Sequence, residues 1–132
     1  DIIGCLNHWV NGWVDWNMVL DRQGGPNWFK NWCIAPVIVD PEQDEVYFTP
    51  LYDVMCHFSK FIRPGATVLA SECTDDELMA VAAETPDGGH VIVCFNPGDT
   101  PRTARIEGLS EDVRIELDAQ TLQTVVLAPQ AP

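Results

Sequence analysis

The segment Gly12–Trp32, GWVDWNMVLDRQGGPNWFKNW, constrains the chain most, because it holds four of its five tryptophans around one Gly-Gly-Pro turn. Carboxylate and amide side chains are interleaved with the indoles. The set comprises Trp13, Trp16, Trp28 and Trp32 with Asp15, Asn17, Asn27 and Asn31. Aromatic faces stack on the apolar face of a pyranose and amides bond its hydroxyls. The composition therefore predicts a surface that binds a sugar by stacking and hydrogen bonding.

The first arm of this segment, residues 13–20, predicts a β-strand because it is rich in β-branched and aromatic residues. Strand alternation places Val14, Trp16, Met18 and Leu20 on one side and Trp13, Asp15, Asn17 and Val19 on the other. Trp16 and the Asp15/Asn17 pair then face opposite ways, unless a bulge follows residue 16.

The second arm follows a turn, DRQGG, whose glycines can adopt backbone angles closed to other residues. Pro26 suits the first position of a short helix. In that helix, residues four apart share a face, so Asn27 lies beside Asn31 and Trp28 beside Trp32. The spacing thus predicts a short helix with one amide face and one indole face.

Two further helices are predicted in the first half of the chain. Apolar residues recur at helical spacing over Ile2–Trp9, and a stop signal follows at Asn11-Gly12. A second helix opens at Thr49-Pro50 with a hydroxyl cap and ends at Pro64-Gly65. Its apolar stripe comprises Leu51, Val54, Met55, Phe58, Phe61 and Ile62.

From residue 66 the pattern changes to short strands. Six runs, TVLASE, LMAVAAET, HVIVCFN, RTARIEG, VRIELD and TVVLAP, show alternation or continuous apolar character. Turn sequences such as Pro86-Asp87-Gly88-Gly89 separate them. The runs predict part of an antiparallel β-sandwich.

Two segments carry a family resemblance. VDWNMVLDRQGGPNWFKNW and TPLYDVMCHFSKFIRPGA resemble the last barrel strand, the loop after it and the final barrel helix of glycoside hydrolase family 30, particularly its glucosylceramidase-like members. DGGHVIVCFNPG extends the resemblance into the second half. The resemblance implies the end of a (β/α)8 TIM barrel over residues 1–65, with the tail of the seventh barrel helix first, and strands of a β-sandwich domain over residues 66–132.

The length adds to this expectation. A complete (β/α)8 barrel takes about 250 residues, whereas this chain has 132. We therefore expect a C-terminal portion of a retaining β-glycosidase of glucosylceramidase or β-glucanase type. The resemblance places both catalytic glutamates upstream of Asp1, so we expect no catalytic residue in this chain. The remainder of the barrel and a β-linked glycoside or glucan are the partners that it implies.

The resemblance also implies roles for individual residues. Trp16 lines the sugar subsite, Asn31 reaches the sugar, Trp28 walls the aglycone side and Asp15 orients neighbouring groups. The residues alone leave other interpretations open, since Trp16 suits a barrel core and Asp15 an ion pair or cap. Trp28 and Trp32 could simply pin the loop, and for Trp32 this is the better interpretation.

Composition excludes several classes of function. The net charge of −13, with seven scattered basic residues, argues against nucleic-acid binding. No apolar run reaches the ~20 residues of a membrane span. The five cysteines lack CxxC spacing and predict buried free thiols. Neither the histidines nor the acidic turn at Asp40–Glu45 has metal-ligand spacing, so we expect no metal and no cofactor.

Two other classes of function stay open. One is a free-standing, non-catalytic carbohydrate-binding β-sandwich module, and the other is a purely structural domain. The aromatic residues gather in the barrel-like part, and Phe95 is the only one in the sandwich-like part. Family members include lysosomal, periplasmic and secreted enzymes, which are the compartments that the resemblance implies.

Overall fold

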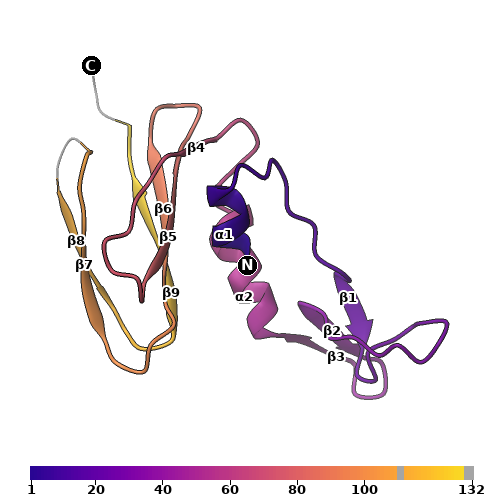
Figure 1. Cartoon of the computed structure of the whole chain (residues 1–132). Coiled ribbons are helices and arrows are strands. Elements are labelled where there is room, and N and C mark those ends of the chain that lie inside the picture. Colours follow the sequence, from indigo (N-terminus) through magenta and orange to yellow (C-terminus); the bar gives the residue numbers. More distant parts are fainter. Residues whose placement is uncertain (110–111, 130–132) are drawn as a thin grey trace. The chain divides into compact units, whose positions relative to one another are not determined.

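The computed structural model describes residues 1–109 and 112–129 (Figure 1). The chain forms two compact units. One consists of Asp1–Asn11 with Lys60–Pro132, and the other of Gly12–Ser59. We call them the sandwich unit and the loop unit and describe each by itself.

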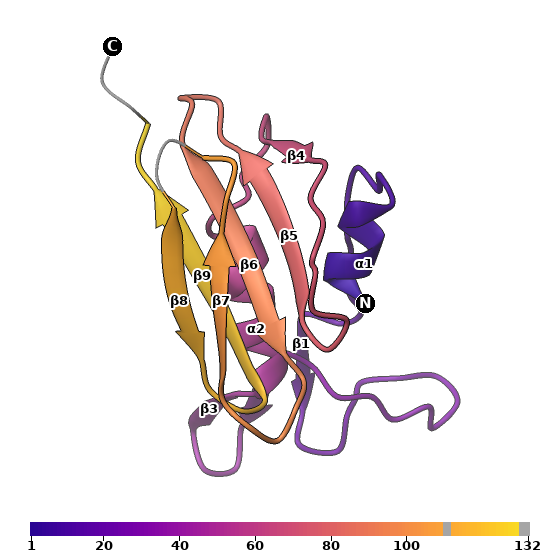
Figure 2. The ribbon, with the colours of Figure 1, turned by 60° about the vertical axis from the view of Figure 1, so that its left-hand side comes forward.

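The sandwich unit contains two antiparallel sheets. The larger has the order β4-β5-β6-β9 and the smaller pairs β7 with β8. The strands are β4 Thr67–Leu69, β5 Met79–Glu84, β6 His90–Asn96, β7 Arg102–Ile106, β8 Val113–Leu117 and β9 Thr121–Leu127. Figure 2 shows the β7–β8 pair lying over one face of the larger sheet. Each of the six predicted runs forms a strand, so this prediction is confirmed.

Alternation along the strands builds the core between the two sheets. One buried cluster is formed by Ile92 and Cys94 of β6, Ile115 and Leu117 of β8, and Leu78, which directly precedes β5. The opposite face of β5 and β6 is buried too, through Val81, Ala83, Val91 and Val93. Burial on both faces explains why β6 reads as a continuous apolar run rather than as an alternating one.

Helix α1, Ile2–Asn7, packs against β5 in the sandwich unit. Ile3 is buried, and the Asn7 side chain donates from Nδ2 to the carbonyl oxygen of Ala80 at 2.8 Å. The predicted helix is therefore present, but it ends before the predicted stop at Asn11-Gly12. Trp9 has a φ of 65°, which the right-handed helix cannot accommodate.

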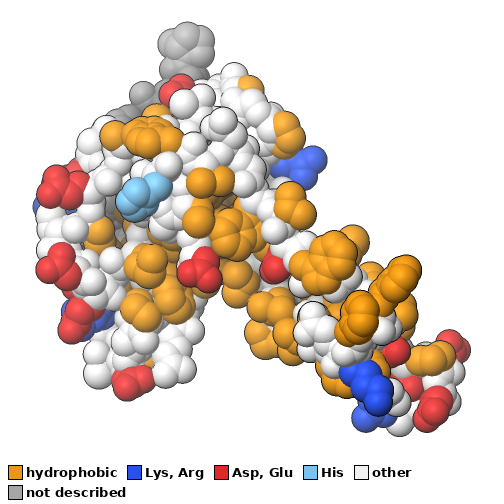
Figure 3. All heavy atoms as spheres, turned by 45° about the vertical axis from the view of Figure 1, so that its right-hand side comes forward, with side chains coloured by type: hydrophobic (Ala, Val, Ile, Leu, Met, Phe, Trp, Pro, Cys, Tyr) orange, Lys and Arg blue, Asp and Glu red, His pale blue; other side chains and the backbone are white. Residues whose placement is uncertain are grey.

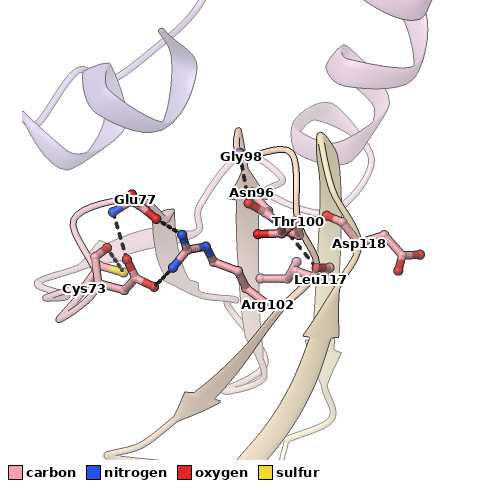
Figure 4. Close-up of polar contacts among 9 residues, drawn as sticks. Cys73, Glu77, Asn96, Gly98, Thr100, Arg102, Leu117 and Asp118 are labelled. Atoms are coloured by element: carbon pink, nitrogen blue, oxygen red, sulfur yellow. Dashed lines mark hydrogen bonds and ion pairs between the residues drawn. The ribbon is translucent and has the colours of Figure 1, made fainter.

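Asn96 is a buried polar residue at the end of β6 (Figure 4). It is 0% exposed, and its Nδ2 donates to the carbonyl oxygens of Thr100 at 2.9 Å, Leu117 at 3.2 Å and Asp118 at 2.9 Å. Its Oδ1 accepts from Gly98 N at 3.0 Å. One side chain thus joins the end of β6 to the end of β8 and to the turn between β6 and β7.

Arg102 joins β7 to the β4–β5 connection (Figure 4). Its Nη1 contacts Asp75 Oδ2 at 3.0 Å, and its Nη2 pairs with Glu77. Asp75 also accepts from the backbone of Glu77 through Oδ1 at 2.9 Å. The acidic connection is therefore held against the smaller sheet by one guanidinium group.

The five cysteines are free, as predicted, but only Cys94 is buried. Burial in the core cluster raises the pKa of its thiol to about 11, with a smaller contribution from Cys73. Cys73 is exposed and the other three are half-buried. The prediction of buried thiols is wrong for Cys73, because it lies on the polar β4–β5 connection rather than on a strand.

We predict that Asn96→Asp lowers the free energy of unfolding of the full-length protein by roughly 3 kcal/mol at neutral pH. The change keeps the shape but replaces the donor to three carbonyl oxygens with an acceptor and a buried charge. Urea unfolding measures the effect. Asn11→Asp, the same change at an exposed position, is the control, and equal stability of the two variants would contradict the role of Asn96.

The loop unit is built on a three-stranded sheet and one helix. Strand β1, Val19–Asp21, pairs in parallel with β2, Val37–Asp40, which pairs antiparallel with β3, Glu45–Phe48. The prediction of a strand over residues 13–20 is wrong for its first six residues. Residues 13–18 have no ladder partner in the described part of the chain, since β2 begins its register opposite Val19.

Asp40 closes the β2–β3 hairpin. Its carboxylate is 3% exposed, contacts Arg22 Nη1 at 2.9 Å and accepts from the backbone N–H groups of Glu42 and Gln43. Burial alone favours the neutral form, but the bonds from Arg22, Gln43 and Glu42 outweigh it and lower the pKa of Asp40. The acidic turn is thus organised by its own first carboxylate.

Helix α2, Pro50–Ser59, begins where the sequence predicts and ends before the predicted stop at Pro64-Gly65. Thr49, expected as the helix cap, donates from its hydroxyl to the carbonyl oxygen of Ala35 at 2.9 Å. The hydroxyl thus ties the start of the helix to the segment before β2. Of the apolar stripe, Phe58 is the buried member.

We predict that Asp40→Asn destabilises the full-length protein above about pH 4 and has a smaller effect at lower pH. Because the folded pKa of Asp40 is lowered, its ionised form stabilises the fold above the unfolded pKa of about 3.9 and loses this contribution as pH falls through the folded pKa. Thermal unfolding across pH 2–7 measures the difference. Asp44→Asn changes an exposed carboxylate in the same turn, and a similar pH profile for both variants would contradict the prediction.

Candidate functional site

The turn after β1 is organised by Asp21. Its Oδ1 accepts from the backbone N–H groups of Gln23 at 2.8 Å and Gly25 at 2.9 Å. Its backbone N–H donates to Gly25 O at 2.8 Å, and its carbonyl accepts from Gly24 N at 3.0 Å. A carboxylate that bonds backbone groups two and four residues on is typical of Asp in turns. Asp21 is not among the residues that the sequence predicts as functional, although its position shortly before Gly24-Gly25 signals a turn residue.

Gly24 closes the neck of the following loop. Its carbonyl accepts from Cys33 N at 3.2 Å, so the chain returns after Trp32 to the point from which it left. Gly24 has a φ of +82°, and a Cβ built there would lie 2.3 Å from Cys33 O. The predicted need for unusual backbone angles is confirmed, and only glycine fits this close approach.

Residues 26–32 form this closed loop, which we call the aromatic loop. The predicted short helix is wrong, because residues 26–32 contain no helical turn and Lys30 has a φ of 55°. The expected pairing of indoles on one helical face is absent as a result. Trp28 is 96% exposed, whereas a Cβ built on Gly25 would lie 3.3 Å from Cζ3 of Trp32. Trp32 thus packs at the neck and Trp28 projects.

Asp15 and Trp16 lie on the extended segment that leads into β1. Trp16 is 76% exposed, and its backbone N–H donates to Asp15 Oδ1 at 2.8 Å. The Trp16–Asn17 peptide bond is cis, as is Gly25–Pro26. Because residues 13–18 are not a strand, the expected conflict between Trp16 and its neighbours over one strand face does not arise.

Apolar side chains dominate the exposed surface of the loop unit. Figure 3 shows hydrophobic side chains gathered there beside basic ones. The most exposed of the large ones are Val14, Trp16, Met18, Trp28 and Phe29. Exposed apolar surface of this extent marks a place that another molecule or chain segment covers.

Asn27 is a functional candidate whose individual role the sequence did not predict. Both polar atoms of its side chain, Oδ1 and Nδ2, are enclosed, and among the described residues they have no hydrogen-bond partner. Unpaired buried amides are rare in folded proteins. The predicted helix would have placed Asn27 and Asn31 on one face. In the observed loop, Asn31 is exposed, whereas the side-chain polar atoms of Asn27 are enclosed.

Neither a group of metal-ligating side chains nor a membrane-spanning helix is found in the part of the chain that the structure describes. Within residues 1–109 and 112–129, no group of three or more histidine, cysteine or acidic side chains could hold a metal ion. In the same residues, neither helix has the length and apolar character that crossing a bilayer requires.

The chain matches two domains of one enzyme family in order. Residues 1–62 match the glycosyl hydrolase family 30 TIM-barrel domain and residues 65–125 its β-sandwich domain. Fold and sequence thus define a portion of a glycoside hydrolase with a barrel and a sandwich. The chain belongs to glycosyl hydrolase family 30, which confirms the family and the fold class that the sequence resemblance implies.

Relatives of known sequence agree with this assignment. The lysosomal acid glucosylceramidase of Mus musculus is 44% identical over 107 residues, which are 77% of this chain and 20% of that protein. The endo-1,6-β-D-glucanase BGN16.3 of Trichoderma harzianum is 29% identical over 71% of this chain and 20% of its own length. The chain therefore spans about a fifth of the length of these relatives.

Solved structures show the same fold. SrfJ from Salmonella typhimurium matches with a TM-score of 0.94 and 31% identity, over 99% of this chain and 29% of that one. The endo-β1,6-glucanase BT3312 matches with a TM-score of 0.85 and 22% identity, over 96% of this chain and 29% of that one. The match to BT3312 supports the fold alone.

We predict that Gly24→Ala destabilises the full-length protein by more than about 1 kcal/mol, because a side chain at this positive φ is strained and collides with backbone. The aromatic loop would then lose its closed neck. Thermal unfolding and tryptophan fluorescence measure the two effects. Gly12→Ala is the matched control, since a Cβ there meets nothing within 4 Å. Unchanged stability and fluorescence in Gly24→Ala would contradict the closed neck.

Proposed function

We propose that this chain is the C-terminal portion of a retaining β-glycosidase of glucosylceramidase or β-glucanase type, which hydrolyses β-glucosidic bonds. In this proposal residues 1–65 complete a TIM barrel and residues 66–132 belong to its β-sandwich domain. The observation that carries the proposal is the match of both family 30 domains, in order, over 1–62 and 65–125.

The loop unit supplies one wall of the proposed sugar site. Trp16, exposed and next to the Asp15 carboxylate that holds its backbone N–H, stacks on the apolar face of the sugar. Asn31, exposed on the aromatic loop, bonds sugar hydroxyls through its amide. Trp28 projects from the same loop and walls the aglycone side. Asp15 acts by fixing the orientation of Trp16.

The chemistry itself is proposed to lie outside this chain. Retaining hydrolysis uses two carboxyl groups about 5–5.5 Å apart, one as nucleophile and one as acid/base. The glutamates of the described residues lie on the β2–β3 hairpin and in the sandwich unit, away from the aromatic loop in sequence. We therefore assign both catalytic glutamates to the upstream remainder of the barrel, and this chain alone is expected to be inactive.

The names of the relatives support a class of substrate and a set of compartments. The mouse relative is named a lysosomal acid glucosylceramidase and the fungal one an endo-1,6-β-D-glucanase. Both names support a β-linked glucoside as substrate, the first within sphingolipid metabolism. We propose a lysosomal, periplasmic or secreted location on the same basis.

A carbohydrate-binding module is the less favoured function. Such a module needs exposed aromatic residues on the sandwich, yet its only aromatic over residues 66–132 is Phe95, which is half-buried. In the loop unit, by contrast, Trp28 and Trp32 are exposed on the aromatic loop, which the neck closes.

The full-length protein tests the proposal directly. It should release glucose from an aryl β-glucoside, and the β anomer should form first in proton NMR, as retention of configuration requires. Glucosylceramide and a β-1,6-glucan then distinguish the two substrate types. Lack of hydrolysis of all three substrates would overturn the proposal.

We predict that Trp16→Ala lowers kcat/KM of the full-length protein by about 10- to 100-fold through lost stacking. Asn31→Ala should lower it by about 3- to 10-fold through lost hydrogen bonds. Steady-state kinetics with an aryl β-glucoside measures both. Trp9→Ala removes another exposed indole, 66% accessible and outside the loop unit, and should leave the kinetics unchanged. A loss in Trp9→Ala equal to that in Trp16→Ala would count against the assigned site.

A further inference from the structure

The polar atoms of the Asn27 side chain are enclosed in the aromatic loop. Neither Oδ1 nor Nδ2 has a partner among the described residues. The residue lies just past the neck, where a Cβ built on Gly25 would be 3.7 Å from Asn27 N and 3.3 Å from the Trp32 ring. It precedes Trp28 directly and Asn31 by four residues.

An amide in this position raises the free energy of the loop conformation in which it is found. Each buried donor or acceptor without a partner costs about 1–3 kcal/mol. A conformation that brings the amide to a partner is favoured by the same amount. Since the aromatic loop is closed only at its neck, through Cys33 N and Gly24 O, its residues can rearrange without breaking the turn at Asp21.

The chemistry of the missing partner follows from the amide itself. An amide offers a donor and an acceptor about as far apart as two neighbouring hydroxyl groups, and each hydroxyl can both donate and accept. A glycoside presents such pairs around its ring. The exposed Trp16 and Trp28 of the same unit offer aromatic faces on which a sugar ring can stack.

We propose that Asn27 is a specificity-determining residue of the site: when a glycoside binds, the aromatic loop rearranges and the Asn27 amide pairs with sugar hydroxyls. This inference rests on the proposed glycosidase function and adds a second amide to Asn31. Pairing of the Asn27 amide with the sugar would couple the conformation of the aromatic loop to the presence of the sugar.

The test is Asn27→Leu in the full-length protein, assayed with 4-nitrophenyl β-D-glucopyranoside. Leucine has a similar volume and no polar atoms, so the free protein should keep or gain thermal stability, because unmet polar groups are removed. The KM should rise by about 3- to 10-fold with kcat retained, because sugar hydrogen bonds are lost. A structural role for a paired amide would instead lower the melting temperature.

Two further variants sharpen the result. Asn27→Asp keeps the shape and the acceptor but loses the donor, so its KM should lie between those of the wild type and Asn27→Leu. Gln23→Leu makes the same amide-to-leucine change at an exposed position in the adjoining turn and should change neither quantity. A lowered melting temperature or an unchanged KM in Asn27→Leu would overturn the inference. A wild type that hydrolyses neither this substrate nor glucosylceramide nor a β-1,6-glucan would instead overturn the proposed function.

Discussion

The neck formed by Asp21, Gly24 and Cys33 is the constraint on which the loop unit depends. One carboxylate oxygen gathers two backbone N–H groups, and the Gly24 carbonyl receives the returning chain. The approach is so close that any Cβ on Gly24 would overlap Cys33 O. Seven residues, 26–32, are thereby held at both ends, and an exposed tryptophan and an exposed asparagine are presented from a defined base.

The sandwich unit also depends on a few directional bonds made by polar side chains. Its apolar strands form a core between two sheets, but apolar contacts are non-directional and do not hold the polar connections at the strand ends. Asn96 and Arg102 supply directional bonds at the edges of that core. Two polar side chains thus determine where the strand ends and the acidic connection lie.

The residues that stabilise the fold are different from those proposed to contact the sugar. Stability comes from buried strands, from Asn96 and from the Asp40 carboxylate, whose pKa is lowered by the groups that bond it. The proposed sugar contacts come from side chains that the fold leaves exposed, on segments without regular secondary structure. Asn27 belongs to neither class, because its side-chain polar atoms are enclosed and have no hydrogen-bond partner among the described residues. This combination is the basis for the role that we propose for it.

The sequence by itself determined the six sandwich strands, both helix starts and the glycine turn. Each depends on a local property of the chain: the period of the apolar residues predicts the strands and the helices, Pro50 marks the start of a helix, and glycine permits the turn. The family resemblance on DWN, GGPNW and HFSKFI was confirmed for the same reason, since it rests on residue identity. Only the tertiary structure decided that residues 13–18 are not a strand and that residues 26–32 form no helix. A strand requires a partner backbone supplied from elsewhere in the chain, and the loop conformation depends on Cys33 returning to Gly24. The tertiary structure also decided that the side-chain polar atoms of Asn27 are enclosed, because enclosure depends on neighbours that spacing along the chain does not specify.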